Sequence, residues 1–196
     1  MPCLLNNKGV DMRIIAGESK NRIIKTKKGT STRPTLSNIR EALFSMIASY
    51  IPGAKILDLF SGSGIIALEA LSRGASKAIM IEKDSEAIKF IIENINNLGY
   101  ENKSRAYKND VLSALNILGR KEEKFNIIFM DPPYELEICA KVLSSVAQNN
   151  LLLADGIIIC EHYINEKLDD FVGLYIKIDE KNYRKKILTF YALNKN

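Results

Sequence analysis

Histidine and cysteine are scarce in this chain. The one histidine, His162, excludes most metal sites and any chemistry that needs a pair of histidines. The three cysteines, Cys3, Cys139 and Cys160, are too few and too scattered for a disulfide framework or a zinc site. Reduced thiols are typical of the cytoplasm. We therefore expect a cytoplasmic protein that uses no metal.

Long apolar runs are also missing. No stretch approaches the roughly 18 apolar residues that a membrane span needs, and residues 1–11 lack the long apolar core of a signal peptide. With 196 residues, 46% of them hydrophobic and 26% charged, the chain suits one globular domain with a sizeable core. We expect no membrane partner.

Positive charge is concentrated near the N-terminus. The net charge is +5, yet residues 1–33 hold eight basic and two acidic residues, so the remainder is slightly acidic. Such a segment is typical of proteins that bind a polyanion, most simply nucleic acid. A solvated basic arm explains the charge equally well, and charge alone does not separate the two hypotheses.

The pattern divides the chain into three segments. Residues 1–11 lack a clear pattern and are either an upstream extension or a disordered leader. Residues 12–54 open with two short β-prone runs, 13–16 and 22–25, which predict a basic hairpin. A helix follows in this segment, with apolar residues at helical spacing, and ends at Pro52-Gly53. Residues 55–196 form the main domain.

Strands and helices alternate in the main domain. Short apolar runs of this kind predict a mostly parallel sheet covered on both faces, an α/β fold of the Rossmann-like type. Two late runs, 174–179 and 186–193, predict an antiparallel pair at one edge of the sheet. The predicted parallel strands are 55–60, 77–82, 104–108, 125–130 and 156–160, and the predicted helices are 64–73, 85–98, 112–118 and 137–148.

A glycine loop follows the first of these strands. Gly62 and Gly64 lie where strand becomes helix, so a ligand can approach the backbone closely. With Ala67 they match the dinucleotide fingerprint G-x-G-x-x-G/A, and Glu82 lies 20 residues after Gly62. A nicotinamide cofactor therefore stays possible on this motif alone.

Acidic residues follow successive strands at the same edge. Asp58, Glu82 and Asp110 each lie near the carboxyl end of a strand, where open α/β sheets bind ligands. The stretch from Asp58 to Gly64, DLFSGSG, resembles motif I of class I S-adenosylmethionine-dependent methyltransferases. That resemblance implies that Glu82 binds the ribose hydroxyls and that Asp110 accepts from the adenine amino group. The predicted cofactor-binding residues are Asp58, Phe60, Gly62, Gly64, Glu82, Lys83, Asp110 and Val111.

The motif DPPY follows the fourth strand. It resembles the (D/N/S)-P-P-(Y/F/W) motif of methyltransferases that modify planar amino groups or amides. The lone pair of such a nitrogen is delocalised, so acceptors must hold it facing the methyl group. Asp131 and the Pro132 carbonyl can accept both N–H bonds, proline rigidity fixes them, and Tyr134 offers a stacking face. We predict these three as catalytic residues; the alternative is a stiff turn.

Several segments together resemble the RsmD family of bacterial methyltransferases. They are MRIIAG from Met12, RPTLSNIREALF from Arg33, DLFSGSG, IEKD and DPPY. The resemblance implies a seven-stranded Rossmann-like sheet with an N-terminal hairpin. It also implies methyl transfer from S-adenosylmethionine to a guanine exocyclic amino group in small-subunit ribosomal RNA, within an assembled or assembling particle. The chain departs from the family at Tyr183-Arg184, where Tyr-Gly is common.

The basic segment then has a role. We expect its side chains to hold RNA phosphates, with binding that weakens steeply as salt rises, and we expect a monomer. The predicted RNA-binding residues are Arg13, Lys20, Arg22, Lys25, Lys27, Arg33, Thr35 and Arg40.

Other functions stay open from the sequence. A DNA adenine-N6 methyltransferase also uses DPPY, but this short chain shows no sequence-reading domain. Protein glutamine methyltransferases have the motif NPPY, and Asp131 at the first position argues against that function. A nicotinamide oxidoreductase would leave DPPY without a role, and a non-catalytic RNA-binding module would leave the ordered acids without one.

Overall fold

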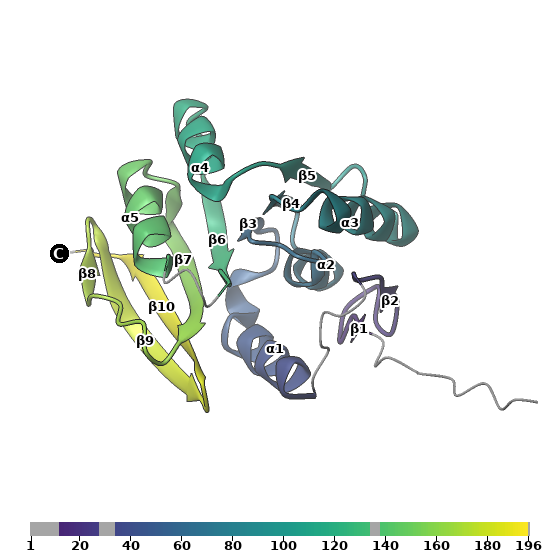
Figure 1. The fold of residues 1–196 in the computed structure, drawn as a ribbon, viewed down its shortest axis with the longest axis horizontal. Coiled ribbons are helices and arrows are strands. Elements are labelled where there is room, and N and C mark those ends of the chain that lie inside the picture. Colours follow the sequence, from purple (N-terminus) through teal and green to yellow (C-terminus); the bar gives the residue numbers. More distant parts are fainter. Residues whose placement is uncertain (1–11, 28–33, 134–137, 196) are drawn as a thin grey trace, which may run out of the picture.

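The computed structural model describes residues 12–27, 34–133 and 138–195, with the backbone alone for residues 34–36. In these residues eight strands form one sheet, in the order β5-β4-β3-β6-β7-β10-β9-β8 (Figure 1). The strands are β3 (Lys55–Leu59), β4 (Lys77–Glu82), β5 (Ser104–Lys108), β6 (Phe125–Met130), β7 (Leu152–Tyr163), β8 (Phe171–Val172), β9 (Tyr175–Tyr183) and β10 (Lys186–Leu193). The helices are α1 (Pro34–Met46), η1 (Ala48–Tyr50, a 3-10 turn), α2 (Ile65–Ser72), α3 (Ser85–Leu98), α4 (Val111–Arg120) and α5 (Cys139–Gln148).

The α/β prediction is confirmed, with one strand more than expected. Strands β3 to β7 pair in parallel, and β10 pairs antiparallel with β7 on one side and with β9 on the other. The additional strand is β8, whose two residues pair with β9. It escaped prediction because two residues are too few to show an alternating pattern.

Both faces of the sheet are covered by helices. Ile56 of β3 packs into the core shared with α1, α2 and α3, while its neighbours Leu57 and Leu59 pack into the core shared with α4 and α5. Figure 1 shows these two helical layers on opposite sides of the sheet. Apolar side chains in both directions explain why the strand reads as an apolar run. No helix in the described part of the chain is long and apolar enough to cross a membrane.

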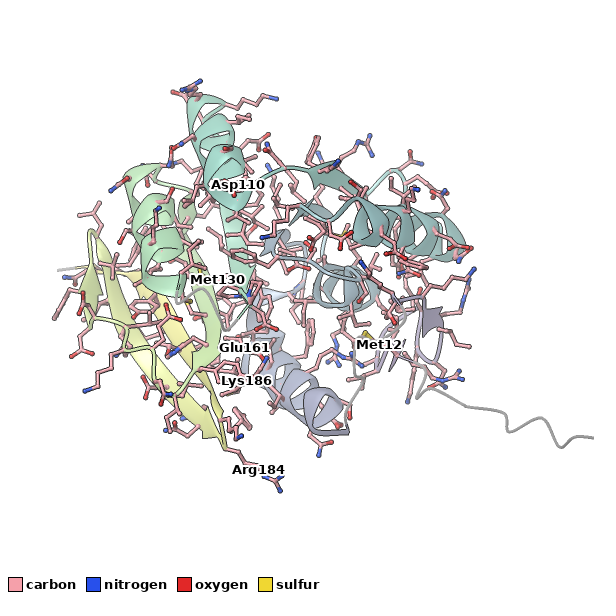
Figure 2. All side chains as sticks on the ribbon, in the orientation of Figure 1. Met12, Asp110, Met130, Glu161, Arg184 and Lys186 are labelled. Carbon is pink, nitrogen blue, oxygen red and sulfur yellow. The ribbon has the colours of Figure 1, made fainter. Side chains whose placement is uncertain are left out.

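The turn after β9 uses a residue that rarely adopts its conformation. Arg184 has φ 57°, a left-handed value that glycine adopts without steric cost. The tight β9–β10 connection therefore forms with arginine where the RsmD resemblance leads one to expect glycine. Figure 2 shows Arg184 at the outer tip of this hairpin.

The N-terminal hairpin is confirmed but is shorter than predicted. Its strands are β1 (Met12–Arg13) and β2 (Ile23–Ile24), which pair antiparallel. Ile14 and Ile24 are buried in the core that also contains α1 and α2. The hairpin therefore packs against the sheet domain rather than extending from it.

A buried carboxylate fastens the hairpin to α2. Glu69 is fully buried and accepts hydrogen bonds from the backbone N–H of Ile15 at 2.7 Å and of Ala16 at 3.0 Å. Arg73 pairs with the same carboxylate at 2.8 Å. Gly17 follows with φ 87°, and a Cβ there would lie 1.8 Å from the carbonyl oxygen of Ser72. Only glycine allows this close approach of the two backbones.

We expect Glu69→Ala to destabilise the protein by about 3 kcal/mol, because two backbone donors and Arg73 lose a buried charged acceptor. Urea denaturation measures the loss, and hydrogen exchange at Ile15 and Ala16 should accelerate. Glu93→Ala is the control: Glu93 belongs to an exposed pair with Lys25, so its removal should cost about 0.5 kcal/mol or less. Equal losses in the two variants would contradict the role of Glu69.

Candidate active site

The glycine loop after β3 has three residues with left-handed backbone. Phe60, Gly62 and Gly64 have φ of 62°, 56° and 78°. A Cβ on Gly64 would lie 3.0 Å from the sulfur of Met80, so packing as well as conformation favours glycine there. Gly64 is the N-cap residue of α2, which begins at Ile65, one residue later than predicted.

Glu82 at the end of β4 fixes the position of this loop. One carboxylate oxygen accepts from the N–H of Gly62 at 2.9 Å, and the other accepts from the N–H of Asp84 at 2.8 Å. Glu82 therefore connects the loop after β3 with the loop after β4. The glycine loop and Glu82, which are 20 residues apart in the sequence, therefore form one hydrogen-bonded unit.

A cavity of about 60 Å³ lies beside this unit. Its lining combines the carboxylates of Glu82 and Asp110 with apolar side chains: acids can accept from hydroxyl and amino groups, and apolar faces can cover a base. The volume is smaller than a whole nucleoside needs, so the residue types and not the size of the cavity indicate the ligand. Asp110 also caps α4 by accepting from the N–H of Ser113 at 3.1 Å. The lining residues are Phe60, Glu82, Lys83, Asp110, Val111, Leu112 and Ile138.

The structure thus brings together five predicted cofactor residues, Phe60, Glu82, Lys83, Asp110 and Val111, and adds Leu112 and Ile138. Leu112 could have been inferred from its position next to Val111. No sequence motif marks Ile138. It lies just before α5 and follows the DPPY motif in the chain, far from the glycine loop in sequence.

Asp58 lies beneath the loop rather than in this cavity. It is 1% exposed and accepts from the N–H of Ala67 at 3.3 Å. Burial raises the pKa of its carboxyl to about 8, against the opposing effect of the Ala67 bond, and the charges of Asp131 and Glu82 act in the same direction as burial. Asp58 is therefore a buried support for the glycine loop in this structure.

Asp131 belongs to a charged cluster that the sequence did not reveal. The Nζ of Lys186 lies 3.2 and 3.4 Å from its two carboxylate oxygens and also pairs with Glu161. Figure 2 shows Glu161 and Lys186 close together near Met130, the last residue of β6. Lys186 and Glu161 are 19% and 8% exposed in their side chains, and Asp131 is 39% exposed. Asp131 is thus the most accessible of these three side chains.

This cluster holds two acids and one base. Burial, followed by the charge of Glu161, raises the pKa of Asp131, while Lys186 opposes both. Burial alone would lower the pKa of Lys186, but the two carboxylates raise it. Lys186 is therefore charged at neutral pH and favours the ionised form of Asp131.

Distance in the sequence explains why the cluster was missed. Lys186 opens β10 and Glu161 lies in β7, and these strands pair antiparallel beside β6. Neither residue belongs to a local motif. Of the other predicted catalytic residues, Pro132 is buried next to Asp131, and Tyr134 lies outside the described residues.

The basic hairpin contacts α3. Lys25 pairs with Glu93, and Lys27 lies 3.1 Å from Asp84 and 2.8 Å from Glu86. Part of its positive charge is thus already opposed by acids of the same protein. A count of charges along the sequence does not reveal these pairs, because the acids lie more than 50 positions from the lysines.

The remaining predicted RNA-binding residues differ in exposure. Arg13, Lys20 and Arg22 are exposed, and Arg22 donates to the carbonyl oxygen of Asn97. Arg40 is only 8% exposed and donates to the carbonyl oxygen of Arg13 at 2.7 Å, so it links α1 to the hairpin. Arg33 and the side chain of Thr35 lie outside the described part.

Comparison with known proteins gives consistent matches. A family model described as conserved hypothetical protein 95 matches residues 12–192. YlbH of Bacillus subtilis is 37% identical over 88% of this chain and 94% of its own length. The ribosomal RNA small subunit methyltransferase D of Escherichia coli is 32% identical over 80% of this chain and 77% of its own length. The solved structure of yhhF from Escherichia coli has a TM-score of 0.84 at 29% identity, covering 95% of this chain and 99% of that one.

We expect the two neighbours of Asp131 to shift its titration in opposite directions. Lys186→Met should raise the pKa of Asp131 because a stabilising positive charge is lost. Glu161→Gln should lower it because a repelling negative charge is lost. Carbon-13 NMR of labelled aspartate carboxyls measures both. Asp155, which pairs with Lys195 at 2.8 Å, should titrate unchanged in both variants. Shifts in the same direction would show that the cluster is wrongly assigned.

Proposed function

From the premise that this chain belongs to the family described as conserved hypothetical protein 95, the RsmD family, we propose that it methylates the exocyclic N2 of a guanine in small-subunit ribosomal RNA. The chain is an S-adenosylmethionine-dependent ribosomal RNA methyltransferase of this family. The observation that carries the finer proposal is the Asp131 carboxylate, held by Lys186 and partly exposed. We further propose that it acts as a monomer on an assembled or assembling particle.

The described residues fit S-adenosylmethionine. Glu82 and Asp110 supply acceptors for ribose hydroxyls and an adenine amino group, and Phe60, Val111 and Ile138 supply apolar contact for the base. The cofactor supplies a methyl group on a positively charged sulfur. No metal or nucleophilic side chain is needed for that transfer, because the leaving group is a neutral thioether.

Asp131 matches guanine better than adenine. An ionised carboxylate is acceptor-only. Guanine presents two adjacent donors, N1–H and N2–H, whereas adenine presents an N6–H donor beside the N1 acceptor. Lys186 favours the ionised form of Asp131 and so favours a base with two adjacent donors. Adenine can still donate from N6 to Asp131, as the DPPY resemblance implies, so product analysis decides between the two bases.

The same carboxylate can take the proton that the reaction releases. The N–C bond forms as the C–S bond breaks, and the methylated nitrogen then gives a proton to Asp131. Its raised pKa makes Asp131 a stronger base than an exposed aspartate. Acceptance of the N–H bonds beforehand keeps the nitrogen in place and its lone pair available.

The assignment is tested by product analysis. The protein is incubated with labelled S-adenosylmethionine and small-subunit particles from a strain that lacks the enzyme, with bare ribosomal RNA, DNA and protein as other acceptors. We expect label in the RNA of the particle and N2-methylguanine after digestion. Label found only in DNA or protein would overturn the proposal.

Asp131→Ala should lower the rate of transfer by about 10²- to 10⁴-fold, because acceptor and base are lost together. Cofactor binding, measured by calorimetry, should change by less than about threefold, since Asp131 does not line the cofactor cavity. The control is Asp169→Ala, an exposed residue outside the cluster. A folded Asp131→Ala protein that no longer binds the cofactor would argue against this role.

A further inference from the structure

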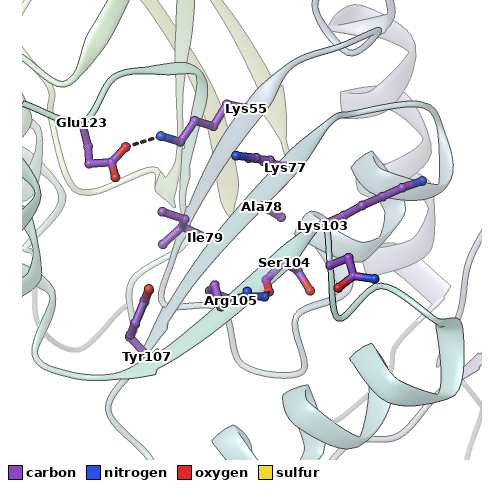
Figure 3. Close-up of a pocket in the computed structure, with 10 residues that line it drawn as sticks. Lys55, Lys77, Ala78, Ile79, Lys103, Ser104, Arg105, Tyr107 and Glu123 are labelled. Atoms are coloured by element: carbon purple, nitrogen blue, oxygen red, sulfur yellow. Dashed lines mark hydrogen bonds and ion pairs between the residues drawn. The ribbon is translucent and has the colours of Figure 1, made fainter.

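A second, larger hollow lies on the face of the sheet next to α4. Two cavities of about 230 and 260 Å³ share Ile79, Tyr107 and Glu123 in their lining and so form one groove. Figure 3 shows the first cavity, where Lys55 and Lys77 begin the neighbouring strands β3 and β4, and Lys103 immediately precedes β5 with its side chain pointing away from them. We call this hollow the β4–β5 groove.

The groove exists because α4 covers the edge of the sheet only in part. Along β5, Ser104 is buried and Ala106 packs towards the core of α3, so Arg105 and Tyr107 face the opposite side. Tyr107 is 49% exposed, and Ile117 of α4 is 43% exposed. An aromatic ring and an apolar side chain are therefore accessible in a hollow of the surface.

The lining of the groove is strongly basic. Lys55 pairs with Glu123, the single acid of the lining, and Lys103 lies 3.6 Å from Glu18 of the N-terminal hairpin, so the charges of these two lysines are already opposed. Among the described residues, no acid pairs with the side chains of Lys77, Lys108 or Lys121, which are all exposed. The six basic residues are Lys55, Lys77, Lys103, Arg105, Lys108 and Lys121. All six come from the part of the chain that is slightly acidic as a whole.

We propose that the β4–β5 groove binds a second segment of the substrate RNA, with phosphates on its lysines and a base stacked on Tyr107. The proposal rests on the proposed function, since RNA is the acceptor there. Excess positive charge with an accessible aromatic ring is the combination by which proteins bind single strands. A second copy of this chain fits less well, because a symmetric contact would bring two basic surfaces together.

The groove extends the contact away from the chemistry. Lys55 and Lys77 open β3 and β4, whereas Asp131 follows the carboxyl end of β6, a parallel neighbour of β3. An RNA strand bound in the groove would therefore run towards the amino ends of β3 and β4, away from Asp131. Loss of this RNA contact should weaken binding of the particle without changing the rate of methyl transfer.

The test neutralises two of these charges with Lys77→Gln/Lys121→Gln. Its control, Lys181→Gln/Lys195→Gln, removes the same charge from the β9–β10 side of the sheet, where both lysines are exposed. We expect the groove variant to raise KM for the particle about tenfold with unchanged kcat and cofactor affinity. The slope of log affinity against log salt should fall by about 1.4, as expected for two phosphate contacts to a single strand.

Stacking is tested separately. Tyr107→Ala should weaken RNA binding about tenfold, and Tyr107→Phe should restore it, because the ring and not the hydroxyl makes the contact. Ultraviolet crosslinking followed by mass spectrometry should find nucleotides on the peptide that contains Tyr107.

The outcomes separate the groove from the proposed function. If the wild-type enzyme methylates RNA, and the groove and control variants bind the particle equally well, the groove proposal is overturned and the proposed function stands. A wild-type protein that methylates no RNA overturns the function, and crosslinking then decides the groove alone. A groove variant that changes oligomeric state instead of RNA affinity assigns the groove to a second copy and overturns the proposal.

Discussion

The ammonium group of Lys186 lies between two carboxylates and connects the parallel and antiparallel parts of the sheet at Asp131. Asp131 follows the parallel strand β6, Glu161 belongs to β7, and Lys186 opens the antiparallel strand β10. Two acids this close repel each other unless a cation neutralises them. Lys186, which comes from the antiparallel part of the sheet, thereby opposes the rise that burial and Glu161 cause in the pKa of Asp131.

A second buried acid has a comparable effect on the N-terminal hairpin. Glu69 replaces the hydrogen-bond partners that the backbone of Ile15 and Ala16 would otherwise find in water. The hairpin is then held against α2, with Arg40 joining it to α1. Since Lys25 and Lys27 already pair with acids of α3, the hairpin is less basic as a surface than its sequence indicates.

Local patterns predicted the elements well and the long-range clusters poorly. Strands β4, β5 and β6 and helix α3 have the predicted boundaries, because apolar runs, Asp84 as an N-cap and Gly99 as a C-cap are local signals. Glu82 and Asp110, which were predicted from their places after successive strands, line one cavity because parallel strands bring their carboxyl ends to one edge. Lys186, Glu161 and Ile138 were missed because no motif marks them and their proximity depends on how β10, β7 and α5 are placed.

The sequence by itself determined the fold class, the glycine loop and the DPPY motif, because each depends on residues close together in the chain. Only the tertiary structure decided where charge accumulates. Counting residues placed the positive excess at the N-terminus, yet strand pairing gathers six basic side chains of the nearly neutral remainder into the β4–β5 groove. Electrostatic potential depends on distances in space, and a linear count contains no such distances.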